Sequence, residues 1–239
     1  MPDGSTPSKK SASPYSTGGG GVRLEHRLGA LYLTRLLTRG VVSELGDRAP
    51  VRVEFQQSPA TTVDDLVLTA QASDGGSSVR LEIAVRRTPN FVQSDDNTQS
   101  LVLALVKADL KAEQTSDNLI ETRLAVAVAG QQRHCRELAE LAVAARSQAD
   151  ADAFFTLINT PGKYATHKRL AQVTSMVSTA LTQIDNTNAS IDTVKDRCWR
   201  LLMRLWIVEL DLEPSNETDW AHSSTLSNPS QPIIPGTGL

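Results

Sequence analysis

The chain has 239 residues and a formal net charge of −3, from 24 Lys and Arg against 27 Asp and Glu. This balance argues against a protein that coats nucleic acid by bulk electrostatics, although it leaves a local basic patch open. No apolar run approaches the ~18 residues of a membrane span, and the N-terminus lacks the apolar segment of a signal peptide. The sequence therefore predicts a soluble cytoplasmic protein without a membrane partner.

Composition divides the chain into four parts. Residues 1–21 are rich in Ser, Gly, Pro and Lys, and residues 214–239 are rich in Pro. Neither end can bury enough apolar surface to order itself, so both are predicted to be flexible. Between them we predict an α/β core over residues 22–130 and a helical extension, packed on that core, over residues 131–213.

Hydrophobic periodicity gives the elements of the core in the order helix, three strands, helix, strand. Their predicted ranges are 22–44 (helix), 51–56, 63–70 and 79–87 (strands), 95–113 (helix) and 123–129 (strand). The second helix connects the third strand to the fourth, and such a crossover favours parallel pairing within a sheet covered by helices. The fold class is therefore predicted to be α/β, with a mixed central sheet in αβββαβ order.

The first helix carries one unusual residue. Leu28, Tyr32 and Leu36 form its apolar stripe at helical spacing, and Glu25 falls within this stripe. A carboxylate there is costly to bury unless it is protonated, paired or bound to a metal. Alternatively, Glu25 lies in a frayed first turn, where it reaches water and is favoured by the helix dipole. The helix alone leaves both alternatives open.

The hairpin over residues 63–91 brings acidic residues together. Side chains alternate along a strand, so Leu81 and Ile83 point to one face and Glu82 to the other. Asp65 lies on the more polar face of the preceding strand, where it can approach Glu82. Two carboxylates on neighbouring strands repel each other unless a cation or a proton lies between them. The hairpin therefore predicts either a bound cation or a proton between the two carboxylates.

The extension reads as further helices without a catalytic signature. The predicted helices cover 132–148, 151–159, 168–184 and 191–205, and residues 205–212 can end the extension as a strand. Cys135 and Cys198 lie in such helices without CxxC spacing, which predicts reduced core thiols. Two groups of basic residues are candidates for phosphate contacts with nucleic acid, although an ordinary solvated surface is the favoured interpretation. They are Lys107 with Lys111, and the cluster Lys163, His167, Lys168 and Arg169.

The order of elements over residues 22–130 resembles the core of the PD-(D/E)xK nuclease superfamily, which has a restriction-endonuclease-like fold. Members place a glutamate on the first helix, an aspartate at the start of the second strand, and an acidic residue, any residue and a lysine on the third. Glu25, Asp65 and Glu82 fall at the acidic positions, and Asp64 is the alternative to Asp65. The resemblance covers about half of the chain.

The resemblance implies a metal-dependent endonuclease that hydrolyses phosphodiester bonds in DNA. Glu25, Asp65 and Glu82 would hold Mg²⁺ or Mn²⁺ and would be catalytic together with Arg86. The sequence departs from the family at the lysine, because Ala84 occupies that position. Arg86 lies two residues further on the same face and can clamp a phosphate, but arginine cannot act as a base.

The whole chain is similar to the N-terminal nuclease-like effector domains of bacterial anti-phage NTPases. This resemblance implies DNA as a partner, and it leaves open a homo-oligomer and a C-terminal NTPase or sensor module. The expected function is an endonuclease effector of anti-phage defence. The alternative is a catalytically decayed adaptor or oligomerisation domain, which Ala84 favours. An unrelated α/β ligand-binding module is the third hypothesis, and it predicts that Asp65 and Glu82 lie far apart.

Overall fold

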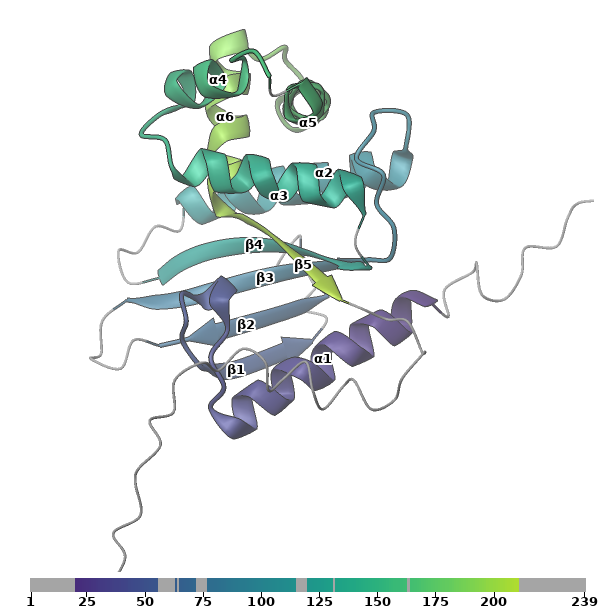
Figure 1. Ribbon diagram of the computed structural model, residues 1–239, viewed down its shortest axis with the longest axis vertical. Helices are drawn as coiled ribbons and strands as arrows, with labels where there is room; N and C mark the ends of the chain where they lie inside the picture. The colour runs from purple at the N-terminus through teal and green to yellow at the C-terminus, as the bar shows by residue number, and fades with distance from the viewer. Residues whose placement is uncertain are drawn as a thin grey trace, which may run out of the picture.

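The computed structural model describes residues 20–55, 63, 65–71, 77–114, 120–130, 132–162 and 164–210. Over these ranges the chain forms six α-helices, one short 3₁₀ helix and five strands (Figure 1). In chain order they are α1 (Gly20–Thr38), η2 (Ser43–Leu45), β1 (Pro50–Phe55), β2 (Leu66–Ala70), β3 (Ser78–Arg86), α2 (Asp96–Gln114), β4 (Ile120–Ala129), α3 (Arg133–Arg146), α4 (Ala151–Ile158), α5 (Tyr164–Asp185), α6 (Ile191–Arg204) and β5 (Leu205–Leu210). None of these helices is both long and apolar enough to cross a membrane.

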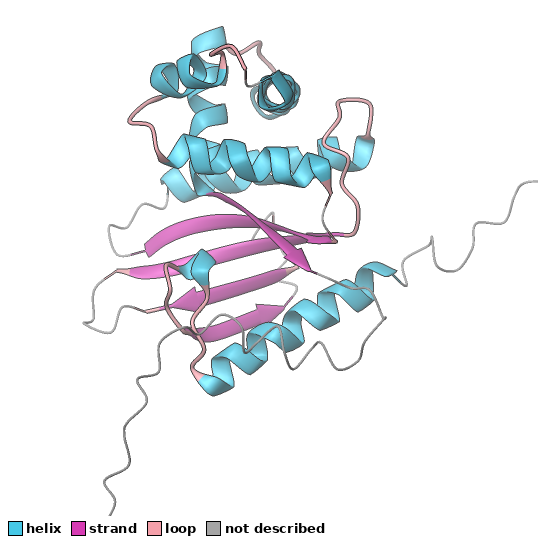
Figure 2. Ribbon diagram, viewed as in Figure 1, coloured by secondary structure: helices cyan, strands magenta, loops and turns pink. Residues whose placement is uncertain are grey.

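The five strands form one open mixed sheet in the order β1-β2-β3-β4-β5. Strand β2 is antiparallel to both of its neighbours, whereas β3, β4 and β5 run parallel to one another. The α2 crossover lets β4 align with β3, as the sequence predicted. The prediction of an α/β fold with a mixed sheet is confirmed, and Figure 2 shows the sheet between its helices.

Strand β5 brings the end of the extension back into the sheet. It pairs in parallel with β4, with Leu124 opposite Leu205 and Ala129 opposite Leu210. The sequence had left a final strand over 205–212 as one way for the extension to end, and the structure has this strand. Within its described residues, the chain after Gly130 therefore supplies four helices and also one of the five strands.

The sheet has two apolar faces that are covered by different helices (Figure 1). On the face that we call the α1 face, Leu24, Leu28 and Tyr32 of α1 pack against inward residues of β2 and β3. The opposite face, here the α2 face, is covered by α2 and the helices of the extension. Buried members of the α1 face include Leu66, Leu68, Leu81, Ile83 and Val85. Those of the α2 face include Ala84, Leu124, Val126 and Val128. This alternation confirms the predicted orientation of the third strand.

Helix α1 ends at Thr38, six residues before the predicted end at 44. Arg39 has a left-handed φ of 53°. Its amide donates to the carbonyl of Leu36 at 3.4 Å, and the amide of Gly40 donates to Arg35 at 2.8 Å. These two bonds form a Schellman motif, which satisfies the last carbonyls and turns the chain away from the helix axis. Glycine is the usual residue at such a left-handed position, so an arginine there gave no signal in the sequence.

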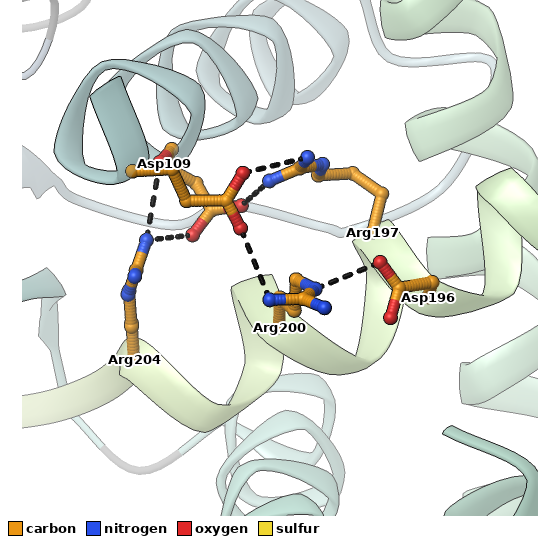
Figure 3. A network of polar contacts seen from close by, with 6 residues as sticks. Asp109, Asp196, Arg197, Arg200 and Arg204 are labelled. Atoms are coloured by element: carbon orange, nitrogen blue, oxygen red, sulfur yellow. Dashed lines mark hydrogen bonds and ion pairs between the residues drawn. The ribbon is translucent and has the colours of Figure 1, made fainter. Parts of the chain in front are cut away.

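A network of charged side chains joins α2 to α6 (Figure 3). Asp109 of α2 is fully buried and accepts hydrogen bonds from Arg197 and Arg204, each at 2.7 Å. Arg197 and Arg200 also form ion pairs with Glu113, at 2.9 and 3.4 Å. Arg197 and Arg204 together compensate the buried charge of Asp109, and Arg197 is shared with Glu113. This network fastens the last helix of the extension to the helix of the crossover.

Candidate functional site

The site predicted from the hairpin lies where β2 begins and β3 ends. Asp65 precedes β2 by one residue and accepts a hydrogen bond from the Val85 amide at 2.6 Å. The same carboxylate oxygen, Oδ2, accepts from Nη1 of Arg86 at 2.8 Å. The two side chains form an ion pair that is partly open to solvent, with 20% of Asp65 and 41% of Arg86 exposed. The structure therefore brings together two of the four predicted site residues.

The register between β2 and β3 fixes which residues face Asp65. Leu66 pairs with Ile83 and Val67 with Glu82. Continuing this register places Ala84 directly across from Asp65. Glu82 is two pairs further along and therefore on the same face, at the diagonal position, where Cα atoms are about 7–8 Å apart. Asp65 therefore lies directly opposite Ala84. Glu82, which was predicted to lie close to Asp65, is at the diagonal position.

Glu82 also has an arginine partner. Nε of Arg80 donates to Oε1 of Glu82 at 2.9 Å, and Glu82 as a whole is only 8% exposed. Ala84, at the position of the family's lysine, is 2% exposed and belongs to the core of the α2 face. The sequence predicted that these two carboxylates need a cation or a proton between them. Arg80 and Arg86 supply positive charge to Glu82 and Asp65 instead.

Glu25, the third predicted metal ligand, lies on α1 and is half-buried. Its neighbours Leu24 and Leu28 pack against the α1 face, whereas Glu82 points to the other face of the sheet. Within the described part of the chain, no three His, Cys, Asp or Glu side chains gather closely enough to hold a metal ion. Asp64, the alternative ligand, lies outside the described residues.

The carboxylates as they are placed do not fit a magnesium site. Mg²⁺ needs near-octahedral oxygen ligation, usually from one or two free carboxylates with water. Asp65 Oδ2 is occupied by an arginine and an amide, and Glu82 Oε1 by a second arginine. A cation at Oδ2 of Asp65 would therefore have to compete with Arg86. The arrangement can bind an anionic group through the solvent-exposed part of Arg86, because guanidinium groups recognise phosphate and carboxylate.

The basic cluster predicted in the extension is divided by the structure. Lys163 lies outside the described residues, and His167 and Lys168 are exposed. Arg169, by contrast, is 4% exposed and is part of the core. Grouping Arg169 with a nucleic-acid surface was therefore wrong. Its place in the apolar stripe with Val173 was the signal that could have shown its burial, since residues i and i+4 lie on one helix face.

Arg169 joins three elements. Its Nη1 donates to the Phe91 carbonyl at 2.6 Å, Nε donates to Glu137 at 3.1 Å, and Nη2 lies 2.8 Å from Nδ1 of His134. Burial acts to raise the pKa of Glu137, but hydrogen bonds from Arg133 and Arg169 lower this pKa below its ordinary value. The ionised carboxylate therefore stays beside Arg169 and holds α3, α5 and the loop after β3 together.

A pocket of about 600 Å³ lies at the opposite end of β3 and β4, with Arg123, Arg146 and Trp206 in its wall. The Arg146 guanidinium lies 4.3 Å from the Trp206 ring centre and donates to the Leu205 carbonyl at 2.7 Å. Burial, followed by the nearby charge of Arg123, lowers the pKa of Arg146. Arg123 donates to the Glu44 carbonyl at 2.9 Å. Both arginines thus have structural acceptors and attach neighbouring segments to the sheet.

Comparisons of the chain with protein-family models, with curated proteins and with solved structures give no match.

Proposed function

We propose that the protein is a non-catalytic interaction domain that keeps the frame of the PD-(D/E)xK nucleases. The αβββαβ order of its core elements supports this relationship, as does Asp65 at the start of the second strand. In the anti-phage systems that the sequence resembles, such a domain would act as an adaptor for an NTPase or sensor partner. Its role would be to associate and not to hydrolyse phosphodiester bonds.

The observation that carries the proposal is the pairing of Arg86 with Asp65 across from Ala84. If Glu82 is taken as the motif's acidic residue, the lysine position holds Ala84. A second alignment assigns the motif's acidic position to the residue opposite Asp65. In that alignment the acidic position holds Ala84 and the lysine position holds Arg86. Both alignments lack one of the groups that the nuclease motif requires, so neither provides a complete metal-and-lysine site.

Electrostatics argues in the same direction. An arginine stays protonated at any physiological pH, so it cannot leave Asp65 by losing its charge. A divalent ion at this place would have to compete with that fixed charge and would then lie beside it. Arginine also cannot take a proton from the attacking water, a step in which a lysine can assist. The site therefore favours a stable ion pair over turnover.

Plasmid cleavage tests the proposal. The full chain is incubated with supercoiled double-stranded DNA and Mg²⁺ or Mn²⁺, and titration calorimetry with each metal is run in parallel. We expect the intact chain to nick the plasmid no more than the buffer control does. We also expect calorimetry to show no metal binding that depends on Glu82, as tested with Glu82→Ala. Metal-dependent nicking by the intact chain that disappears in Asp65→Ala would overturn the proposal. Gln183→Ala, at an exposed and uncharged position on α5, serves as the purification-matched control, because a contaminating nuclease would act equally in both variants.

The second candidate is the metal-dependent endonuclease of anti-phage defence. What favours it is that Asp65 and Glu82 point to the same face from adjacent strands. In this alternative DNA binding moves Arg86 from Asp65 to a phosphate, and Asp65 and Glu82 take up Mg²⁺. Glu25 would join them only if α1, which covers the opposite face, moved. Equal cleavage by the intact chain, Asp65→Ala and Glu82→Ala, or no cleavage with any divalent metal, would exclude it.

A further inference from the structure

Strand β1 forms an edge of the sheet. It pairs with β2 on one side, and no other strand among the described residues pairs with its second side. Unpaired amides and carbonyls along an edge form a template for another strand. Proteins usually protect such edges with charged side chains, proline, a β-bulge or a covering element. Strand β1 has Pro50 and a bulge at its start and the charges of Arg52 and Glu54, so an interaction at this edge has to match those charges.

Exposed apolar side chains are concentrated beside this edge. Five of the eight exposed large hydrophobic residues in the described part of the chain belong to α1, the loop after it and β1. They are Leu33, Leu37, Val41, Val51 and Phe55, and Leu37 is 83% exposed. Scattered exposed leucines need no explanation, but an apolar group beside an unpaired edge indicates an interaction surface.

The leucines of α1 and the strand β1 lie side by side. A methyl group at Gly29 would come within 2.5 Å of the Phe55 ring, so this side of α1 touches β1. Leu33 and Leu37 continue the Gly29 row at i+4 spacing. Figure 1 shows α1 and β1 running in opposite directions. From Gly29 to Leu37 the helix rises about 12 Å, and from Phe55 back to Val51 the strand covers about 13 Å. The row of α1 residues therefore stays beside β1 along its length.

We propose that two copies of the chain form a two-fold symmetric dimer through their β1 edges, with the axis at Val53. The strands would pair antiparallel and extend the sheet across both copies. Arg52 would lie opposite the partner's Glu54, and Val53 opposite the partner's Val53. Leu33 and Leu37 of each copy would then lie on the same face of the joined sheet.

Charge complementarity selects this axis. Arg52 is followed two residues later by Glu54, and the two already form a 2.9 Å ion pair within one chain. With the axis at Val53, each arginine meets a carboxylate of the other copy. An axis at position 52 or 54 would place like charges opposite each other, which is destabilising. Closed two-fold association also consumes both β1 edges, so the contact ends at a dimer.

A β-bulge limits the length of the pairing. The register of β1 shifts between Pro50 and Arg52, which leaves Val51 without a direct partner on β2. A bulge twists the strand and interrupts a regular ladder. The regular part of the contact is therefore the short segment around Val53, and the α1 leucines supply the remaining apolar area. This interface does not include Asp65 or Arg86, so it is independent of whether the chain cuts DNA.

Charge reversal combined with mixing tests the dimer. Light scattering on the full chain should give a mass twice that of the 25.8 kDa monomer. Arg52→Glu and Glu54→Arg should each weaken self-association about tenfold or more, because like charges then face each other. Mixed together, the two variants should form a heterodimer, because one chain is acidic at both positions and the other basic. The intrachain ion pair cannot be restored by mixing, so recovery is specific to the interface.

The apolar part of the surface has a matched control. Leu37→Lys should weaken the dimer, whereas Ile191→Lys, at a similarly exposed residue of α6, should not. Circular dichroism and thermal unfolding verify that every variant is folded. A monomeric intact chain at all attainable concentrations would overturn the proposal. So would a dimer that survives both single reversals, or variants that fail to associate when mixed. Mass and DNA cleavage are separate measurements, so this proposal and the proposed function can fail independently.

Discussion

A single arginine determines what the Asp65 carboxylate can do. Arg86 contributes one ion pair that is open to water, and the Val85 amide contributes a hydrogen bond that is partly buried. Asp65→Ala removes the acceptor of both, whereas Arg86→Ala leaves the bond from the amide. We expect Asp65→Ala to lower the free energy of unfolding by about 1–3 kcal/mol. Arg86→Ala should cost about 1 kcal/mol or less.

Urea denaturation of the two variants beside the unmodified chain measures this difference. Hydrogen exchange of the Val85 amide gives a second measurement. This amide loses its acceptor in Asp65→Ala but keeps it in Arg86→Ala, so its exchange should be faster in Asp65→Ala. An equal loss of stability in both variants would show that the amide bond contributes nothing.

The two buried thiols make a prediction about pH. Burial raises the pKa of Cys135 to about 11 and that of Cys198 to about 12, from an ordinary value of 9.0. Burial also raises the pKa of the Tyr32 hydroxyl. A raised folded-state pKa stabilises the protein below the unfolded pKa, and this contribution is lost as pH rises towards the folded value. The free energy of unfolding should therefore decrease as pH rises above 9, towards about 11.

Urea denaturation at a series of alkaline pH values measures the decrease, and the variant with both cysteines changed to alanine should show a smaller one. Thiol labelling at neutral pH is a second measurement, since a buried thiol reacts slowly. Labelling of the folded chain at the same rate as the unfolded chain would contradict the burial of both cysteines.

Alternation along β3 was enough to predict that Glu82 and Arg86 share a face, and the structure agrees. It was not enough to predict the partner of Asp65. That depends on the register between β2 and β3, and a shift of one residue exchanges every facing pair. Nor did helical periodicity show that α1 covers the face opposite Glu82. The apolar stripe of α1 identifies the side of the helix that is buried, but it does not identify the face of the sheet against which α1 packs.

At the scale of elements, the Asp109 network is the strongest polar link between α2 and α6. Removing its carboxylate leaves Arg197 and Arg204 in a partly buried position without their shared acceptor. We expect Asp109→Ala to lower the free energy of unfolding by about 2–4 kcal/mol. Asp196→Ala breaks an exposed ion pair with Arg200 on the same network (Figure 3) and should cost about 0.5 kcal/mol or less.

Chemical denaturation of the two aspartate variants checks the difference, and equal effects would contradict the assignment of Asp109 as the central acceptor. The double variant Asp109→Ala with Arg204→Ala extends the test. If the cost of the single change comes from an uncompensated guanidinium, removing Arg204 as well should recover part of the lost stability.

Most elements were predictable because their periodicity is strong. The helix predicted over 95–113 is α2 (Asp96–Gln114), and the strand predicted over 123–129 lies within β4 (Ile120–Ala129). The end of α1 was less predictable, because a left-handed arginine terminates it. The place of β5 in the sheet could not be read from the sequence at all. The sequence pattern of a strand predicts its extended conformation. The strand with which it pairs depends on the path of the chain through the four preceding helices.

The sheet and the extension pack together over the described residues, because one apolar cluster continues from the sheet into the extension. Ala84, Leu105 and Leu124 of the core share this cluster with Leu138 and Cys198. A chain truncated after Gly130 would expose the α2 face and lose β5. We expect it to show no cooperative unfolding transition in urea, whereas the intact chain should show one. A truncated chain with a sigmoidal transition would establish an independently folding core.

The return of β5 has a consequence for synthesis. Strand β4 is buried over most of its length, and its outer edge is covered only by a segment that begins at Leu205. During translation this apolar edge leaves the ribosome long before its partner does. Parallel pairing across such a separation is slow, and unpaired strand edges are the parts of a nascent chain that aggregate. The sheet is completed only after β5 has been synthesised, so we expect the unpaired edge of β4 to be most prone to aggregation in the interval between the synthesis of β4 and that of β5.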